Sequence, residues 1–346
     1  MTRTIVLIPT YRGGGAEVIS LMLLRHLISQ GRLVKGICFN ATGPYSAEFA
    51  QLSVDEYREP RMFKWPLILA KYRLNSDDLV ISMIRSTSLV LFPFVNRIGR
   101  IICREANTLD NLTEMKLVKR EIYLYLLKRV YRSDNVKLIY NSYITKNSLE
   151  KIGSHKNVVI PNPIRFNFKG FGEKNNKDNC IRIIHLGRFN KQKNHQFLVN
   201  LGIDLKRQGL DFVMDFYGDG PLRSYFKEKI KDLSLTNNIR IHQFTLNIES
   251  HLNHYDMLLL PSFYEGFGNV VLEALASGLS VITSENVGAS YFIDHPKLSI
   301  LPLNIIKWRE HVIKQFIYTP SNYDADSMFR SLERFKVDKI FAEYLE

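Results

Sequence analysis

The residues best suited to chemistry lie in the stretch Glu265-Gly-Phe-Gly-Asn-Val-Val-Leu-Glu273. The apolar run 257–260 before it and the helical pattern 270–277 after it predict a strand, a glycine loop and a helix. Such a loop brings backbone N–H groups and the positive end of a helix dipole to a phosphate. Carboxylates here do not hold the phosphate, so we expect Glu265 and Glu273 to accept hydrogen bonds from neutral hydroxyls of a ribose or a sugar. The stretch therefore predicts a nucleotide-sugar pocket.

Two cations, Arg188 and Lys193, stand five positions apart in the loop that follows a predicted strand at 181–186. When a sugar leaves a nucleotide, the remaining diphosphate gains negative charge. Fixed cations stabilise that charge most strongly as the bond breaks, which lowers the barrier. A solvated basic loop is the alternative interpretation, because Lys191 lies in the same loop without an evident role.

In its setting between Leu260 and Gly278, the glutamate pair resembles the motif of the retaining GT-B glycosyltransferases of family GT4. The loop from Arg188 to Lys193 is similar to a second motif of this family. The resemblance implies two Rossmann-like, doubly wound α/β domains that face each other across a cleft. It also implies catalytic roles for Glu265, Arg188 and Lys193, with both cations on the pyrophosphate, and contact of Glu273 with the ribose.

The same resemblance assigns three glycine loops to nucleotide-sugar binding: Gly266, Phe267, Gly268 and Asn269; Gly14 and Gly15, which precede Glu17; and Gly218 and Gly220. Plain tight turns are the alternative for the last two loops. Glu105 and Asn107 follow a predicted strand at 100–103 and are acceptor-side candidates. Related enzymes often have a histidine where this chain has Ala106, and a structural role for Glu105 is equally open.

A chain of 346 residues is longer than one hydrophobic core usually serves, and strands alternate with helices along it. We expect an acceptor-binding domain at 1–165, a nucleotide-sugar-binding domain at 166–320 and a C-terminal helix at 321–346 that crosses back to the first domain. Residues 172–179 lack apolar side chains and are typical of an interdomain linker.

The net charge of +13 is concentrated in the first half. Residues 1–165 contain 25 Lys/Arg and 13 Asp/Glu, whereas residues 166–346 contain 22 and 21. This asymmetry indicates a polyanionic partner, with solubility as the alternative. The segment 114–132 combines six basic residues with an apolar stripe, which is typical of a helix lying on an anionic membrane; packing of that stripe on its own domain is the alternative.

Other site classes are not indicated. Cys38, Cys103 and Cys180 fit neither a disulfide framework nor a zinc site, so a reducing compartment is expected. No cluster of metal ligands is evident, and Asp324-Ala-Asp326 is interpreted as helix capping. The start of the chain has a strand pattern without a signal peptide, and no apolar run is long enough to span a membrane.

Together these features predict a metal-independent glycosyltransferase without a resident cofactor, using a UDP- or GDP-sugar. The resemblance to family GT4 implies that transfer is retaining. The expected acceptor is a glycan, lipid-linked, in bacterial surface polysaccharide biosynthesis (O-antigen, capsule, exopolysaccharide or lipopolysaccharide). The expected location is the cytoplasm, peripheral on the inner face of the cytoplasmic membrane, without nucleic acid as partner. The alternatives are a nucleotide-sugar 2-epimerase of the same fold, a non-catalytic partner subunit of a two-chain glycosyltransferase, and a nucleic-acid-binding protein.

Overall fold

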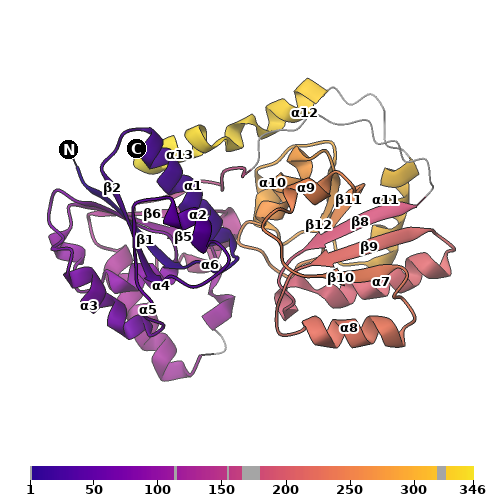
Figure 1. Cartoon of the computed structure of the whole chain (residues 1–346), viewed down its shortest axis with the longest axis horizontal. Helices are drawn as coiled ribbons and strands as arrows, with labels where there is room; N and C mark the ends of the chain where they lie inside the picture. The colour runs from indigo at the N-terminus through magenta and orange to yellow at the C-terminus, as the bar shows by residue number, and fades with distance from the viewer. Residues whose placement is uncertain (1, 113–114, 154–155, 166–179, 318–324) are drawn as a thin grey trace. The chain divides into compact units, whose positions relative to one another are not determined.

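A computed structural model of the chain describes residues 2–112, 115–153, 156–165, 180–317 and 325–346. The chain forms two compact units, residues 1–165 with 335–346 and residues 166–334. Each unit contains one parallel β-sheet with helices on both faces (Figure 1). The prediction of two Rossmann-like α/β domains is therefore confirmed. The expected linker 172–179 lies outside the described residues.

The first unit has a seven-stranded sheet in the order β3-β2-β1-β4-β5-β6-β7. Its strands are β1 (Thr4–Thr10), β2 (Val34–Asn40), β3 (Val54–Glu56), β4 (Leu79–Ser82), β5 (Arg100–Glu105), β6 (Val136–Tyr140) and β7 (Asn157–Val159). Its helices are α1 (Gly15–Ser29), α2 (Ser46–Ala50), α3 (Trp65–Ala70), α4 (Arg85–Val90), α5 (Leu117–Tyr131), α6 (Tyr143–Leu149) and α13 (Val337–Leu345), with 3₁₀ turns η1 (Met62–Lys64), η2 (Val95–Arg97) and η3 (Leu109–Leu112).

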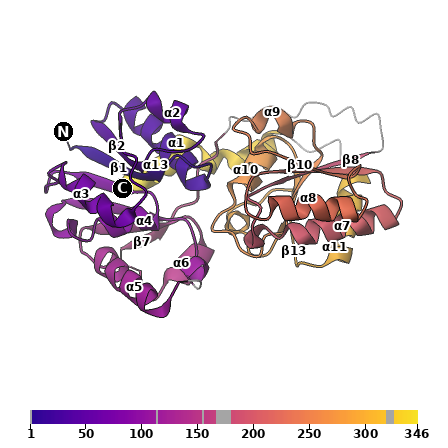
Figure 2. The ribbon, with the colours of Figure 1, turned by 60° about the horizontal axis from the view of Figure 1, so that its bottom comes forward.

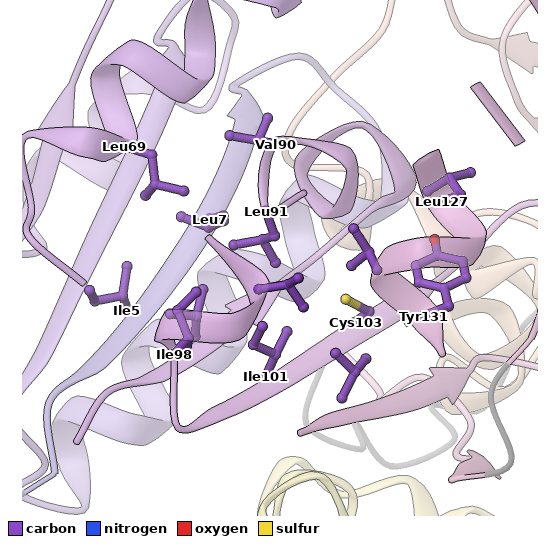
Figure 3. Close-up of a cluster of buried hydrophobic side chains, with 14 of the residues drawn as sticks. Ile5, Leu7, Leu69, Val90, Leu91, Ile98, Ile101, Cys103, Leu127 and Tyr131 are labelled. Carbon is purple, nitrogen blue, oxygen red and sulfur yellow. The ribbon is translucent and has the colours of Figure 1, made fainter. Parts of the chain in front are cut away.

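The central strands of this sheet are apolar on both faces because helices cover both sides. Residues 5–8 of β1, for example, are fully buried. Helices α3, α4 and α5 cover one face, where their side chains meet those of the strands in a single core (Figure 3). Helices α1 and α13 lie on the other side of the sheet (Figures 1 and 2).

The second unit has a six-stranded sheet in the order β10-β9-β8-β11-β12-β13. Its strands are β8 (Ile181–Leu186), β9 (Phe212–Tyr217), β10 (Ile239–His242), β11 (Met257–Leu260), β12 (Ser280–Ser284) and β13 (Leu298–Leu301). Its helices are α7 (His195–Arg207), α8 (Arg223–Asp232), α9 (Glu249–Leu252), α10 (Asn269–Ala276), α11 (Ile305–Ile317) and α12 (Ala325–Leu332), with 3₁₀ turns η4 (Lys191–Lys193) and η5 (Gly288–Tyr291); a third, η6 (Glu333–Phe335), ends at the first residue of the returning segment.

The expected single C-terminal helix is wrong in one respect, because the chain leaves the helical path between α12 and α13. The carbonyl of Phe335 accepts a hydrogen bond of 2.7 Å from the amide of Ile164, and Lys336 is extended. Helix α13 then packs on α1, where Asp338 contacts the ring of His26 at 3.0 Å. Among the described residues, no helix is both long and apolar enough to cross a membrane.

Candidate functional site

In the second sheet, strands β9 and β10 are added on one side of β8, whereas β11, β12 and β13 are added on its other side. Strands β8 and β11 are therefore neighbours at the point where the strand order reverses, although about 75 positions separate them in the sequence. Met257 pairs with Ile183 and Leu258 with Ile184. Loops that leave the carboxyl ends of two such strands border a crevice, where open α/β sheets bind their ligands. The loop after β8 contains Arg188 and Lys193, and the loop after β11 contains Glu265. The topology therefore brings the two predicted motifs to the same edge of the sheet.

The two loops are joined by an ion pair. Lys193 Nζ lies 2.5 Å from Glu265 Oε1, and both side chains are largely buried, at 14% and 11% exposure. Gln192 Nε2 donates to the same carboxylate oxygen at 3.3 Å and to the carbonyl of Tyr264 at 2.9 Å. The amide of Phe263 donates to the Gln192 carbonyl at 2.9 Å. The cation and the carboxylate are thus held in place by side-chain and main-chain contacts.

The course of the first loop follows from its two asparagines. The side chain of Asn190 accepts a hydrogen bond from the Lys193 amide at 3.2 Å, which closes the turn η4. Asn194 is left-handed, with φ of 52°, and its side chain donates to the Pro261 carbonyl at 3.2 Å. Arg188, in contrast, is exposed to solvent. The loop therefore presents one fixed cation and one exposed guanidinium group.

Gly218 and Gly220 support this loop from the end of the neighbouring strand β9. A Cβ atom at Gly218 would lie 2.1 Å from the Gly187 carbonyl oxygen, and one at Gly220 would lie 2.6 Å from the Phe189 carbonyl oxygen. The amide of Phe189 donates to the Asp219 carbonyl at 2.9 Å. Glycines are required here because two backbones touch. The structure thus gives these glycines a contact with the cationic loop, and their predicted contact with a nucleotide stays a prediction.

The glutamate motif folds as expected around the start of α10. Gly268 adopts a left-handed conformation, with φ of 90°, and the helix begins at Asn269. Glu273 lies one turn into the helix and is 7% exposed, and Gly266 is buried in the preceding loop. The side chain of Phe267 is only 2% exposed and faces the ring of Phe292 at 6.1 Å. Phe267 can therefore contribute to a ligand site only through its backbone.

Two buried histidines lie close to the cationic loop. The rings of His185 and His195 are 4.7 Å apart, and His195 stacks on Phe189 at 4.1 Å. Burial lowers the pKa of His185 to about 3 and that of His195 to about 2, so both rings are neutral at physiological pH. Phe189 and His195 stand before and after the segment that contains Lys193. We infer that their stacking helps to hold this segment in place.

In the first unit, the loop Gly13 to Gly15 follows β1 at the corresponding reversal point, between β1 and β4. Gly14 is the N-cap residue of α1, and the carboxylate of Glu17 lies against it. A Cβ atom at Gly14 would lie 2.6 Å from Glu17 Oε2. The Thr10 hydroxyl donates to Glu17 Oε1 at 2.8 Å. Burial raises the pKa of Glu17, a shift that the Thr10 hydrogen bond opposes. Glu17 therefore fixes the glycine loop.

Glu105 lies at the end of β5, as predicted, but it is 1% exposed. Its carboxylate pairs with Arg85 at 2.9 Å and accepts a hydrogen bond from the Tyr131 hydroxyl. Arg85 also donates to the carbonyl of Asn107 at 2.6 Å. In this arrangement Glu105 cannot touch an acceptor, which corrects that part of the prediction, whereas the side chain of Asn107 is exposed.

Sequence reasoning missed Gln192, Asn190 and Arg85. Each is a polar residue within or beside a predicted motif. The only signal in the sequence that could have indicated them is that each lies after the end of a strand. In the described parts of the chain, no three His, Cys, Asp or Glu side chains lie close enough to hold a metal ion.

Comparison with known proteins shows what the chain is similar to. Residues 167–314 match the family described as glycosyl transferases group 1. The chain is 35% identical over 103 residues to a putative glycosyltransferase, EpsF, of Bacillus subtilis, covering 30% of this chain and 27% of EpsF. It is 24% identical over 295 residues to a Campylobacter jejuni N-acetylgalactosaminyltransferase whose name specifies a diphospho-undecaprenol substrate, covering 79% and 78% of the two chains. The segments matched to EpsF and to the glycosyltransferase YqgM of B. subtilis span only 27% and 54% of those proteins.

Among solved structures, Anabaena HepE in complex with UDP and glucose superposes with a TM-score of 0.80, at 18% identity, over 100% of this chain and 99% of HepE. WaaG, a glycosyltransferase involved in lipopolysaccharide biosynthesis, superposes with a TM-score of 0.72 at 14% identity, over 98% of both chains. Residues 167–314 are therefore similar to the glycosyl transferases group 1 family, and the chain as a whole has the GT-B fold of these solved structures.

Proposed function

We propose that this protein is a glycosyltransferase that moves a sugar from a nucleotide-sugar donor to a glycan acceptor with retention of the anomeric configuration. The observation that carries the proposal is the pairing of Lys193 with Glu265 at the reversal point of the second sheet, beside the exposed Arg188. Cations and a carboxylate at one crevice match a ligand with a diphosphate at one end and neutral hydroxyls at the other.

Each group has a distinct task in this reaction. Arg188 and Lys193 bind the diphosphate and stabilise the charge that develops on it as the glycosidic bond breaks. Glu265 orients Lys193 and accepts a hydrogen bond from a donor-sugar hydroxyl, while Glu273 accepts hydrogen bonds from the ribose. The departing diphosphate oxygen takes the proton of the acceptor hydroxyl, which attacks from the same face. These two cations supply the charge that a metal ion would otherwise provide, so we propose that transfer is metal-independent.

The proposed donor is a UDP-sugar, because HepE, which shares this fold, was crystallised with UDP and with UDP-glucose. A GDP-sugar is the competing donor. The proposed acceptor is a lipid-linked precursor of a bacterial surface polysaccharide. Support comes from the C. jejuni relative, from a 30% identical amylovoran biosynthesis glycosyltransferase of Erwinia amylovora and from the lipopolysaccharide enzyme WaaG.

Helix α5 is the proposed membrane contact. Its inner side packs into the core through Leu127, Val130 and Tyr131. Its outer side exposes four apolar residues, Leu117, Val118, Ile122 and Tyr125. Basic side chains such as Lys119 and Arg129 lie beside them on the surface. An amphipathic helix of this kind is suited to the headgroup layer of an anionic membrane at the cytoplasmic face. Reversing the charges of Lys119 and Arg129 should abolish sedimentation with anionic vesicles, whereas reversing those of Lys227 and Lys231 on α8 should not.

Thermal unfolding with UDP, GDP, ADP and CMP tests the donor site. A nucleotide at 100 times its dissociation constant stabilises the fold by about 2.7 kcal/mol, a shift of a few degrees. We expect one nucleotide to stabilise the wild type and Glu228→Ala, an exposed glutamate of α8, but not Glu273→Ala. Equal stabilisation of both variants would refute the assignment of Glu273, and no stabilisation of the wild type would refute the donor site.

The product decides between transfer and epimerisation. A retaining transferase joins the sugar to the acceptor with the donor's anomeric configuration, which the proton coupling of the anomeric carbon reports by NMR. A 2-epimerase would convert the nucleotide-sugar in the absence of any acceptor, and that result would overturn the proposal.

A further inference from the structure

The backbone that follows strand β5 in the first unit is held by side chains from two other segments. The Ala106 carbonyl accepts a hydrogen bond of 3.2 Å from the side chain of Asn141, which follows β6. Arg85, the first residue of α4, donates to the Asn107 carbonyl at 2.6 Å and to the Thr108 carbonyl at 3.4 Å. Three consecutive carbonyl groups are thus anchored, which is how a functional group on a loop is held in one position.

Arg85 is itself fixed by a buried ion pair. Its side chain is 10% exposed, and its Nη2 atom lies 2.9 Å from Oε2 of Glu105, whose side chain is 1% exposed. The Tyr131 hydroxyl donates to the other oxygen of this carboxylate. A guanidinium group has five N–H donors in a planar fork, so it can bind a carboxylate and two carbonyls together, whereas a lysine ammonium is a compact point charge. Arg85 therefore joins the carboxylate and the loop into one rigid unit.

Asn107 is the polar side chain that this loop exposes to solvent. Its neighbour Ala106 has no polar side chain, and Thr108 is only 3% exposed. Within the described residues, the side-chain amide of Asn107 has no hydrogen-bond partner. Because Arg85 balances the charge of Glu105, the loop offers a neutral amide, which both donates and accepts hydrogen bonds. A sugar hydroxyl has the same two capacities and is the ligand group that this amide suits.

We infer that Arg85 is a positioning residue for transfer: it fixes the backbone of Asn107, whose side-chain amide binds a hydroxyl of the acceptor glycan. The inference deepens the proposed function and rests on it, because it takes the glycan acceptor from that proposal. It also gives the buried pair of Arg85 and Glu105 a task. A buried ion pair by itself adds little stability compared with apolar packing, so its value here lies in the loop that it holds.

The first unit contains a similar bridge at the opposite edge of its sheet. Arg3 donates to both carboxylate oxygens of Asp78 at 2.7 Å and to the Tyr72 carbonyl at 3.2 Å. Arg3 and Asp78 directly precede β1 and β4, so this bridge lies at the amino ends of the strands, whereas open α/β sheets bind ligands at the carboxyl ends. Arg3→Lys is therefore the matched control for a purely structural effect of Arg85→Lys.

Hydrogen exchange measures the anchoring directly. Arg85→Lys keeps a cation beside Glu105 but loses the fork, so the backbone amides of residues 106–109 should exchange about tenfold faster than in the wild type. Arg3→Lys should leave the exchange of this segment within about twofold of the wild type. Equal exchange of residues 106–109 in Arg85→Lys and the wild type would overturn the inference, whatever acceptor the enzyme uses.

Kinetics with UDP-glucose as donor, and octyl glucoside and octyl galactoside as acceptors, test the acceptor contact. Asn107→Ala should lower kcat/KM for the acceptor about tenfold, as expected for the loss of a hydrogen bond, and should leave the KM for the donor unchanged. Arg85→Lys should cause a loss of similar size, whereas Arg3→Lys should not. The double variant Arg85→Lys/Asn107→Ala should lose no more than Asn107→Ala alone, because both changes act on the same contact. Losses that multiply in the double variant would overturn the inference.

Thermal unfolding with UDP separates the two possible failures. UDP should stabilise the wild type, Arg85→Lys and Asn107→Ala equally. If no nucleotide stabilises the wild type while residues 106–109 still lose protection in Arg85→Lys, the proposed function fails and the anchoring by Arg85 stands. If UDP stabilises the wild type and Asn107→Ala transfers glucose as fast as the wild type, the proposed function stands and the inference is wrong.

Discussion

Gly218 offers a sharp test of how the cationic loop is held. A Cβ atom at this position would lie 2.1 Å from the Gly187 carbonyl oxygen and 2.9 Å from its carbon, where ordinary contact begins at 3.4 Å. The obstacle is backbone and cannot rotate away. Gly218→Ala must therefore move the start of the Arg188 loop by about 1.3 Å, the difference between 3.4 and 2.1 Å.

The displacement predicts a larger effect on catalysis than on stability. Misplacing a binding group by about 1 Å costs on the order of 100-fold in rate. The steric cost to the fold is about 2 kcal/mol, typical of overpacking at a single site. Gly209→Ala is the matched control: its φ is +72°, and a Cβ atom there meets nothing within 4 Å. That change should cost about 1 kcal/mol of stability through backbone strain alone.

The assay is donor-sugar turnover by both variants at a temperature well below either midpoint of unfolding. We expect Gly218→Ala to lose about 100-fold in kcat/KM and Gly209→Ala to stay within about twofold of the wild type. Turnover by Gly218→Ala within about threefold of the control would show that the loop after β8 does not need this position to act. The reasoning from backbone contact would then be refuted.

Two further predictions concern the groups around the same loop. Lys193→Ala should lower the free energy of unfolding by about 2 kcal/mol. This is less than the loss of a partner in a fully buried ion pair would cost, because both side chains keep some solvent contact. The double variant Lys193→Ala/Glu265→Gln should recover part of this loss. The control is Lys191→Ala, which changes an exposed lysine two positions away. If the changes in the free energy of unfolding of the single variants, measured in urea, simply add up to that of the double variant, the pairing is contradicted. His195 has a folded-state pKa of about 2 against about 6.5 in the unfolded chain, so its contribution to stability is present above pH 6.5 and is lost as the pH falls toward 2. His195→Phe keeps the stacking on Phe189 and removes one bound proton from the unfolded state, which should flatten the acid limb of the stability curve by about 1.4 kcal/mol per pH unit. Parallel acid limbs for the wild type and this variant, measured by urea unfolding between pH 4 and 7, would show that the ring is not the group that titrates.

The parts of the fold that could be predicted from the sequence are those with strong local signals. Strands β1 and β11 contain continuous apolar runs, because helices cover both faces of each sheet. The short strands β3, β7 and β13 have only three or four residues and sit at or near the sheet edges, so their patterns are too brief to recognise. Helix α3 was missed for a similar reason: it has six residues, with Pro66 at its start.

The parts of the site that could not be predicted depend on contacts between distant positions. Glu105 follows a strand, as an acceptor-binding residue would, but its partners Arg85 and Tyr131 lie 20 and 26 positions away. The break between α12 and α13 depends on a hydrogen bond from Ile164 to Phe335. Residue type and local spacing indicate where a polar group stands in the chain, whereas its exposure is decided by the neighbours that packing brings to it.

The cationic loop shows how these two levels combine. The sequence places three cations in this loop, Arg188, Lys191 and Lys193, and only the family resemblance assigns Arg188 and Lys193 to the pyrophosphate. Of these three cations the structure fixes only Lys193, through Glu265 from the loop after the adjacent strand β11 and through the turn that Asn190 closes. A cation already held in place costs little reorganisation when charge develops on a bound diphosphate, whereas an exposed lysine must first lose its freedom. We therefore expect Glu265 to contribute to catalysis by orienting Lys193, in addition to any contact of its own with a donor sugar.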